Sequence, residues 1–255
     1  MRHRAIAALL LAACSGCIGS RPATTPIGTR SISPDPAPSG SCLVVFLPGR
    51  RDGPGAYGRH RFPRIAAEAG VTADYLEADA HLGYYVAETI STRLYEDVLA
   101  PARARGREKI WIVGISMGGL GGLLSARDHP DATRGVVALA PFLGDTEPGL
   151  VAAAGGLSAW RSGYPRPVAD YERELWGWLQ RYTAAGATKP PVWLGWGLSD
   201  DLAGADKLLG DALPPARTLT VPGAHDWRTW TELWRAFLAT GALQNDCRAG
   251  AAPSP

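Results

Sequence analysis

The sequence predicts an α/β protein: a doubly wound, mostly parallel sheet of about six strands, with helices on both faces and a small helical lid. Two observations support this fold class. Short apolar runs alternate with longer amphipathic stretches from Cys42 onward, as in chains built from repeated β-α-β units. In addition, residues 109–115 are apolar after the first position, as is usual for a strand that helices cover on both faces.

The composition of the 255-residue chain is that of an ordinary globular protein. Hydrophobic residues make up 46% and charged residues 20% of it, which excludes a disordered chain, a fibrous rod and a highly basic nucleic-acid binder. The formal charge of +2 includes Arg2 and Arg4; removing these two from the 26 basic residues leaves 24, which balance 24 acidic residues. No nucleic-acid partner is therefore expected.

The first residues have the pattern of an export signal. Two arginines precede a nine-residue apolar run at 5–13, which is too short to span about 30 Å of hydrocarbon, so residues 1–13 are interpreted as a signal peptide. The sequence Leu-Ala-Ala-Cys at 11–14 resembles the bacterial lipobox, and this resemblance implies that Cys14 is acylated. Cys17 is a weaker candidate, and a plain secretory signal cut before Cys14 is the alternative. The expected location is the bacterial cell envelope, with the exported protein lipid-anchored on the periplasmic or surface side.

Residues 14–41 are expected to form a tether between the anchor and the folded domain. Five prolines lie among Ser, Thr and Gly in this segment, without an apolar periodicity that a core could bury. Such a composition favours an extended, solvated chain. The folded domain is therefore predicted to span residues 42–247, and residues 248–255 are predicted to form a disordered tail.

Six strands and six helices are predicted within the domain. The strands lie at residues 42–47, 72–76, 109–115, 135–140, 192–196 and 218–221. The helices lie between them, at about 58–69, 87–104, 117–128, 168–185, 201–212 and 226–240. Residues 142–187 are longer than a simple crossover, and we expect them to form the lid over the carboxyl edge of the sheet.

The most specific catalytic pattern is Gly114-Ile-Ser116-Met-Gly118-Gly119, which follows the most apolar strand and precedes a helical stretch. A serine at so tight a strand-to-helix turn adopts strained backbone angles, and small residues two positions before and after it let strand and helix approach. A glycine-rich packing turn and a phosphate-binding loop are the alternatives, but the Gly-Lys-Ser/Thr of a P-loop is absent.

This pattern resembles the nucleophile elbow, G-x-S-x-G, of the α/β-hydrolase family, which includes serine esterases and lipases. The resemblance covers about residues 42–240. It implies that Ser116 is the nucleophile of a Ser-His-Asp triad.

The resemblance also indicates the general base, which the family carries on the loop after the last strand. His225 occupies that place, in Pro-Gly-Ala-His225-Asp226-Trp. His60 and His81 precede Ser116, so they do not fit the family's chain order, although either could line the cleft. A surface histidine that caps the last helix is the alternative interpretation of His225.

The acid of the family follows the penultimate strand, where the sequence reads Gly197-Leu-Ser-Asp200-Asp201. The common G-x-x-D spacing selects Asp200. Asp201 stays open as an alternative, because a carboxylate at the start of a helix is favourable without any catalytic role. Asp145 is a minor alternative, and Asp226 is too close in sequence to His225.

An oxyanion hole requires two backbone N–H donors. The resemblance assigns one to Met117, which follows the nucleophile, and the other to the loop after the first strand. There Pro48-Gly49 replaces the His-Gly of many relatives, so Arg50 is the expected donor and Gly49 the next candidate. The side chains of Arg50 and Arg51 are expected to pair with Asp52 on the surface rather than to select an anionic substrate.

Aromatic residues lie close to the expected site. His81, Tyr84 and Tyr85 follow the second strand on the same edge of the sheet and are expected near the pocket. A second set shares one face of the last helix, for which core packing is favoured over sugar binding: Trp227, Trp230 and Trp234.

The fold implied by the resemblance brings two cysteines together at the bottom of the domain. Cys42 opens the first strand, and Cys247 follows the last helix, which runs from the active-site edge to the opposite edge. Because an exported compartment permits oxidation, a Cys42–Cys247 disulfide is expected.

The sequence as a whole predicts an exported serine hydrolase that cleaves an acyl ester, as a carboxylesterase does, through a covalent acyl-enzyme. The expected partner is a small-molecule acyl substrate, with the membrane reached through the lipid anchor. No cofactor or metal is expected, because Cys and His do not cluster at ligand spacing. The competing hypothesis is a non-catalytic lipoprotein that uses the same scaffold for binding.

Overall fold

The structure, a computed structural model, describes residues 21–33, 42–163, 171–186 and 190–248. The predicted signal peptide at 1–13, the lipidation candidate Cys14 and residues 249–255 of the predicted tail lie outside the described residues.

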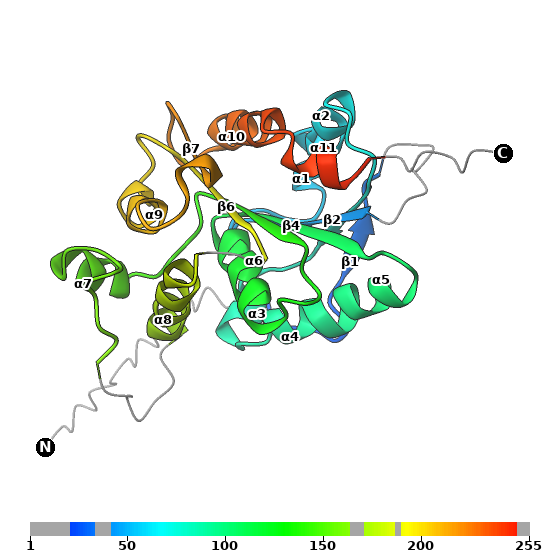
Figure 1. The fold of residues 1–255 in the computed structure, drawn as a ribbon. Helices are drawn as coiled ribbons and strands as arrows, with labels where there is room; N and C mark the ends of the chain where they lie inside the picture. The colour runs from blue at the N-terminus through cyan, green and yellow to red at the C-terminus, as the bar shows by residue number, and fades with distance from the viewer. Residues whose placement is uncertain (1–20, 34–41, 164–170, 187–189, 249–255) are drawn as a thin grey trace, which may run out of the picture.

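The described strands form one sheet in the order β1-β3-β2-β4-β5-β6-β7 (Figure 1). Their bounds are β1 Thr29–Ser31, β2 Cys42–Leu47, β3 Asp74–Ala78, β4 Lys109–Ile115, β5 Gly135–Leu139, β6 Val192–Gly197 and β7 Thr218–Val221. All neighbours are parallel except β1 and β3. The α/β fold class is thus confirmed, and the antiparallel edge strand β1 adds one strand to the six predicted.

Helices cover both faces of the sheet (Figure 1). One face carries α1 Ala56–Arg59, α2 Phe62–Glu68, α10 Trp227–Ala239 and α11 Ala242–Asp246. The opposite face carries α4 Ile90–Leu94, α5 Ala100–Ala104 and α6 Met117–Asp128. The remaining helices are α3 Leu82–Val86, α7 Glu147–Ala153, α8 Tyr171–Ala184 and α9 Ala203–Gly210.

The helix predicted at 87–104 is helical from Ile90 to Ala104, but its middle, Tyr95–Leu99, is a π-helical turn. Pro101 has no N–H to donate to the carbonyl of Asp97 four residues earlier, and its ring crowds that carbonyl. A local widening of the helix accommodates this missing bond.

The face under α10 is packed with aromatic rings. The Trp234 ring stacks on Phe62 with centroids 5.5 Å apart, and its indole N–H donates to the Phe62 carbonyl at 3.1 Å. Phe46 of β2 contacts Tyr57, Phe62 and Trp234. Trp230 and Trp234 are buried, as core packing of the last helix requires.

The segment at 142–163 and 171–186, expected to form the lid, contains α7 and α8. The carboxylate of Glu172 at the start of α8 accepts the N–H groups of Asp145, Thr146 and Glu147 at 2.9 Å each. The buried Glu147 in turn binds Arg173 and the indole N–H of Trp160. These charge-assisted bonds fix α7 and α8 relative to each other.

Residues 21–33, here named the strap, differ from the expectation of a solvated tether that ends at residue 41. Ile27 is only 3% exposed and belongs to the core, while β1 of the strap pairs with β3. Ile27 is buried and Ile32 is partly buried against the core. These isolated apolar residues form no periodic pattern, so hydrophobic periodicity does not predict the strap. The packed domain therefore includes residues upstream of Cys42.

The bottom of the domain is closed by a covalent link between Cys42 at the start of β2 and Cys247 after α11, whose Cα atoms are 5.6 Å apart. Nearby polar contacts also hold this end of the chain. The Asp246 carboxylate accepts from the Trp111 indole at 2.8 Å and from Arg134 at 2.8 Å, and Thr72 N–H donates to the Cys247 carbonyl at 2.9 Å.

Candidate active site

Ser116 lies at the sharp turn between β4 and α6, with φ 53° and ψ −116°. A non-glycine residue with positive φ is strained, and such strain persists only where the surrounding structure imposes it. Here the glycines impose it: a Cβ on Gly114 would overlap the Gly118 carbonyl, and a Cβ on Gly118 would overlap the Leu47 carbonyl. The turn is fixed to β5 as well, because Ser116 N–H donates to the Leu139 carbonyl at 3.0 Å.

The imidazole of His225 is bound to the carboxylate of Asp200. Its Nδ1 lies 2.8 Å from Oδ2 and 3.0 Å from Oδ1 of Asp200. Asp200 is 6% exposed, and its Oδ1 also accepts the Leu202 N–H at 2.8 Å. An ionised carboxylate that accepts Nδ1–H leaves Nε2 unprotonated, which is the tautomer a general base requires.

The loops that carry Asp200 and His225 are bonded to each other at the carboxyl ends of β6 and β7. Leu198 N–H donates to the Val221 carbonyl at 2.9 Å, and Ser199 N–H to the Gly223 carbonyl at 2.8 Å. Gly223 has φ 144°, a conformation that glycine adopts without strain. Local backbone bonds therefore bring together two residues 25 positions apart in sequence.

The other carboxylates considered from the sequence lie elsewhere. Asp201 and Asp145 are exposed. Asp226 caps α10, because its side chain accepts the Thr229 N–H at 2.8 Å, and this bond lowers the pKa of its carboxyl group. The structure therefore distinguishes Asp200, which binds His225, from its neighbour Asp201.

The loop after β2 lies beside the nucleophile. A Cβ on Gly49 would be 3.7 Å from the Ser116 Cβ, so the backbone of Gly49 and Arg50 approaches the turn closely. Met117 begins α6, and the N–H groups of a first helical turn have no partner within the helix. The two backbone donors expected from the sequence thus belong to segments that flank Ser116.

The expected surface pairing of Arg50 or Arg51 with Asp52 is absent from the ion pairs of the described residues. Instead the Asp52 carboxylate accepts the indole N–H of Trp227 at 3.0 Å. The Trp227 ring stacks on His60, with centroids 4.1 Å apart and planes at 2°. Burial lowers the pKa of His60. The bond between Asp52 and Trp227 joins residues 175 positions apart, so no local sequence pattern could reveal it.

A pocket of about 290 Å³ adjoins Met117. We name it the side pocket; α3, α4, α6 and α8 enclose it. Its apolar lining consists of Leu82, Val86, Ile90, Met117, Leu120 and Leu124. Polar and aromatic residues complete the lining: Tyr85, Glu88, Ser91, Thr92, Arg127, Asp128, Tyr171 and Glu174.

The three residues expected near the pocket have different positions. Tyr85 lines the side pocket, and its hydroxyl is buried without a hydrogen-bond partner among the described residues. Burial raises the pKa of this phenol. His81 caps α3 by accepting the Gly83 N–H at 3.2 Å, and Tyr84 binds the strap through Thr24.

Asp206 in α9 is a buried acid that the sequence did not single out. It is 0% exposed, and neither carboxylate oxygen has a hydrogen-bond partner among the described residues. Burial, and secondarily the charge of Asp200, raise the pKa of Asp206 well above its ordinary value. The carboxyl group of Asp206 is therefore harder to ionise than an exposed aspartate.

The described residues contain neither a candidate metal site nor a helix that could span a membrane. No group of three or more His, Cys, Asp or Glu side chains there is arranged to hold a metal ion. None of the described helices combines the length and apolar character needed to cross a membrane.

Comparison with known proteins identifies a sequence family that matches the chain and solved structures with a similar fold. The sequence model of the Esterase family, described as "Putative esterase", matches residues 73–240. This range includes Ser116, Asp200 and His225 and covers more than half of the chain. No curated protein sequence matches the chain significantly.

Three solved structures illustrate the fold. MPT51 of Mycobacterium tuberculosis has a TM-score of 0.58 at 17% identity, covering 87% of this chain and 94% of that one. A ferulic acid esterase has a TM-score of 0.55 at 15% identity, and the match covers 79% of this chain and 85% of that one. The monoacylglycerol lipase of Paleococcus ferrophilus has a TM-score of 0.53 at 18% identity, and the match covers 84% of this chain and 97% of that one. At these identities the likeness shows the fold, which is that of α/β hydrolases.

Proposed function

The chain belongs to the Esterase family, and from that premise we propose that it is a serine hydrolase that cleaves carboxylic esters through Ser116, His225 and Asp200. The observation that carries this proposal is the 2.8 Å bond between His225 Nδ1 and the buried carboxylate of Asp200, on the same sheet edge as a strained serine turn. Strain at a solvent-reachable serine is typical of a functional site.

In the proposed mechanism the Ser116 hydroxyl attacks the ester carbonyl while His225 Nε2 accepts its proton. The N–H groups of Met117 and Arg50 stabilise the negative charge that develops on the carbonyl oxygen. The protonated His225 then donates its proton to the leaving alcohol, and Asp200 stabilises the imidazolium. Water, deprotonated by the same histidine, attacks the acyl-enzyme, and breaking its ester bond releases the acid and restores Ser116.

Labelling with a fluorophosphonate probe tests the nucleophile. We expect the wild-type protein to be labelled and the Ser116→Ala variant not to be. Hydrolysis of p-nitrophenyl esters should be lost in the same variant, whose folding is checked by circular dichroism. Labelling that survives Ser116→Ala contradicts the assignment, and a folded wild-type protein that is neither labelled nor active favours the non-catalytic binding alternative.

The neighbouring aspartates form a matched pair for testing the acid. Asp200→Asn removes the carboxylate that orients His225, and we expect kcat to fall by about 10⁴-fold. Asp201→Asn changes an exposed residue one position away, and its kcat should stay within about twofold of wild type, because surface substitutions have small effects. Equal losses in the two variants would argue against Asp200.

We further propose that residues 1–13 direct export and that Cys14 is acylated, so that the protein is anchored in the bacterial cell envelope. The lipobox-like sequence before Cys14 supports this proposal. Incorporation of labelled palmitate is its test: label should enter the wild-type protein and be lost in Cys14→Ser. A panel of p-nitrophenyl esters of graded chain length measures the acyl preference.

A further inference from the structure

The strap is fastened to the part of the domain that borders the side pocket. Arg21 forms an ion pair with Asp79, just before α3. Thr24 Oγ1 lies 3.0 Å from the Tyr84 hydroxyl, which also donates to the Thr24 carbonyl at 3.1 Å. A Cβ on Gly83 would overlap the Arg21 carbonyl, so the strap backbone lies directly on α3.

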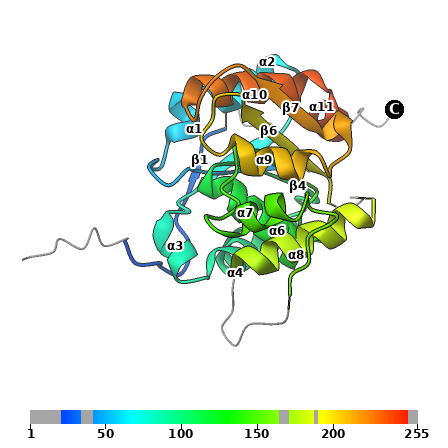
Figure 2. The same cartoon turned by 90° about the vertical axis from the view of Figure 1, so that its left-hand side faces the viewer.

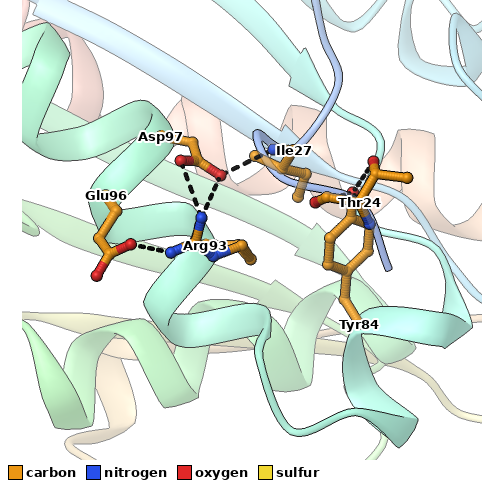
Figure 3. Close-up of polar contacts among 6 residues, drawn as sticks. All are labelled: Thr24, Ile27, Tyr84, Arg93, Glu96 and Asp97. Carbon is orange, nitrogen blue, oxygen red and sulfur yellow. Dashed lines mark hydrogen bonds and ion pairs between the residues drawn. The ribbon is translucent and has the colours of Figure 1, made fainter. Parts of the chain in front are cut away.

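A second set of contacts holds the strap a few residues later. Ile27 N–H donates to the Asp97 carboxylate at 2.8 Å, and Arg93 binds both Asp97 and Glu96 (Figure 3). The Arg93 and Asp97 side chains are largely buried, at 13% and 11% exposure, so solvent screens this charge-assisted bond little. The strap is therefore part of the folded domain from Arg21 onward, and Figure 2 shows its blue ribbon beside α3.

This attachment shortens the linker between a lipid on Cys14 and the domain to the segment from Cys14 to Arg21, here named the leash. The sequence predicts a tether that ends at residue 41, but Arg21, only seven positions after Cys14, already contacts the domain. Seven residues span at most about 25 Å when fully extended. A lipidated Cys14 therefore keeps α3 within that distance of the bilayer surface.

The same helix forms the rim of the side pocket. Val86 at the end of α3 is 68% exposed, and Tyr171 at the start of α8 is 41% exposed; both line the pocket. The buried residues Ile90, Leu120 and Leu124 also line the pocket. Charged residues, among them Glu88 and Glu174, complete the lining. Met117, next to the proposed nucleophile, forms another part of the wall.

We propose that the short leash and the strap hold the mouth of the side pocket against the bilayer, and that the substrates are long-chain acyl esters resident in that membrane. An acyl chain that leaves the bilayer would pass Val86 and Tyr171 and enter the apolar pocket, with its ester group toward Ser116. Exposed apolar side chains around a pocket mouth are typical of such an interaction surface. This inference rests on the proposed serine hydrolase activity and on the proposed acylation of Cys14.

Two insertions of the same length distinguish the effect of the short leash from the effect of membrane anchoring alone. The first places about 20 Gly/Ser residues, with a root-mean-square length of roughly 25 Å, between Ser20 and Arg21. The second places the same segment after Pro38, between the strap and β2, where it leaves the Cys14-to-Arg21 distance unchanged. Each full-length, lipidated protein is reconstituted into phosphatidylcholine vesicles doped with 4-methylumbelliferyl palmitate. Water-soluble 4-methylumbelliferyl acetate, which has the same leaving group, reports the activity of the catalytic residues.

We expect all three proteins to hydrolyse the acetate at equal rates. The insertion before Arg21 should lower hydrolysis of the vesicle-borne palmitate by roughly eightfold, since the effective concentration at the end of a flexible tether falls with about the −3/2 power of its length. The insertion after Pro38 should leave that rate unchanged.

Equal palmitate rates for the two insertions, or no decrease with either, overturn the inference while leaving the serine hydrolase intact. Absence of the lipid from Cys14 in a protein that still cleaves the acetate also overturns it. Failure to cleave the acetate or to react with a fluorophosphonate identifies failure of the proposed function instead.

Discussion

Among single residues, the buried carboxylates near the candidate site differ in the partners that the fold gives them. Asp200 accepts His225 and a backbone N–H. Glu77 accepts the N–H groups of Gly55 at 2.7 Å and Ala56 at 3.0 Å, although burial still raises its pKa. Asp206 has no partner among the described residues. Burial without a compensating bond favours the neutral acid, so Asp206 differs chemically from Asp200.

This difference predicts a pH-dependent gain in stability for Asp206→Asn. The raised pKa of Asp206 in the folded state means that the folded protein binds its proton more tightly than the unfolded chain, whose ordinary value is about 3.9. Above that pH the unfolded chain ionises freely, so wild-type stability is lost as pH rises toward the folded-state pKa. Asparagine is neutral throughout, and we expect it to raise the free energy of unfolding by about 1–3 kcal/mol at pH 7.

Thermal unfolding of the wild type and Asp206→Asn between pH 4 and pH 8 measures this effect. The difference in Tm should shrink as the pH falls toward about 4, where the unfolded wild-type chain begins to bind a proton at this position as well. A difference that is independent of pH would show that ionisation of Asp206 does not cause it.

The sequence supports single-residue predictions only where a local pattern exists. Ser116 and His225 stand out because a motif and a strand-to-helix boundary surround each of them. The G-x-x-D spacing favours Asp200 over its neighbour Asp201 but leaves both open, and in the structure Asp200 is the one that binds His225. The Asp52–Trp227 bond and the isolation of Asp206 depend on contacts between distant segments, which no local pattern encodes.

At the scale of elements, the turn between β4 and α6 depends on close backbone contact among three segments. Gly118 faces the Leu47 carbonyl at the end of β2, Gly114 faces Gly118, and Gly119 faces Pro141 after β5. A side chain at any of these positions would push the helix away from the strands. The glycines therefore set the position of the serine as well as the strain on it.

Alanine at Gly118 and at Gly204 forms a matched test of this packing. Gly118→Ala places a methyl group against the Leu47 carbonyl, and we expect it to lower stability by about 1–3 kcal/mol or more and to abolish fluorophosphonate labelling. Gly204→Ala changes a helical glycine in α9 with nothing within 4 Å. It should be neutral or stabilising by up to about 1 kcal/mol.

Circular dichroism melts and labelling rates measured side by side provide the comparison. If Gly118→Ala melts and reacts as Gly204→Ala does, the close approach of β2 and α6 is not what positions Ser116.

The elements themselves were predicted well where burial gives them a clear pattern. β2, β4 and β7 and helix α6 have the predicted bounds, because continuous apolar runs and flanking Pro or Gly define them. Helix α3 and strand β1 were missed. Both are short, and β1 is exposed along its length, so tertiary contacts rather than their own residues determine their structure.

At the scale of the whole molecule, the chain is closed at the edge of the sheet opposite the candidate site. The Cys42–Cys247 link joins the first parallel strand to the end of the last helix, 205 positions apart. Asp246 adds bonds to Trp111 and Arg134 beside it. The two ends of the hydrolase domain are thereby held together away from the substrate.

Replacement of both cysteines by serine should lower the stability of the domain and preserve its catalysis. The link restricts a long loop in the unfolded chain, and the loop-entropy model gives about 5 kcal/mol for such a length, with 2–4 kcal/mol typical of measured disulfides. We expect the double variant to melt at a lower temperature and to retain its kcat on a soluble ester. Thermal unfolding with and without a reductant checks this, because reductant should lower the Tm of the wild type only.

The pairing of β1 with β3 has a further consequence, for the behaviour of the protein in solution. Without the strap, β3 would be the outermost strand of the sheet, and its N–H and C=O groups on that side would be free to pair with another molecule. Three residues of β1 occupy that side, and Arg30 places a positive charge within it. The strap therefore protects the sheet from edge-to-edge aggregation, a role that a chain shortened to begin at Cys42 would lose.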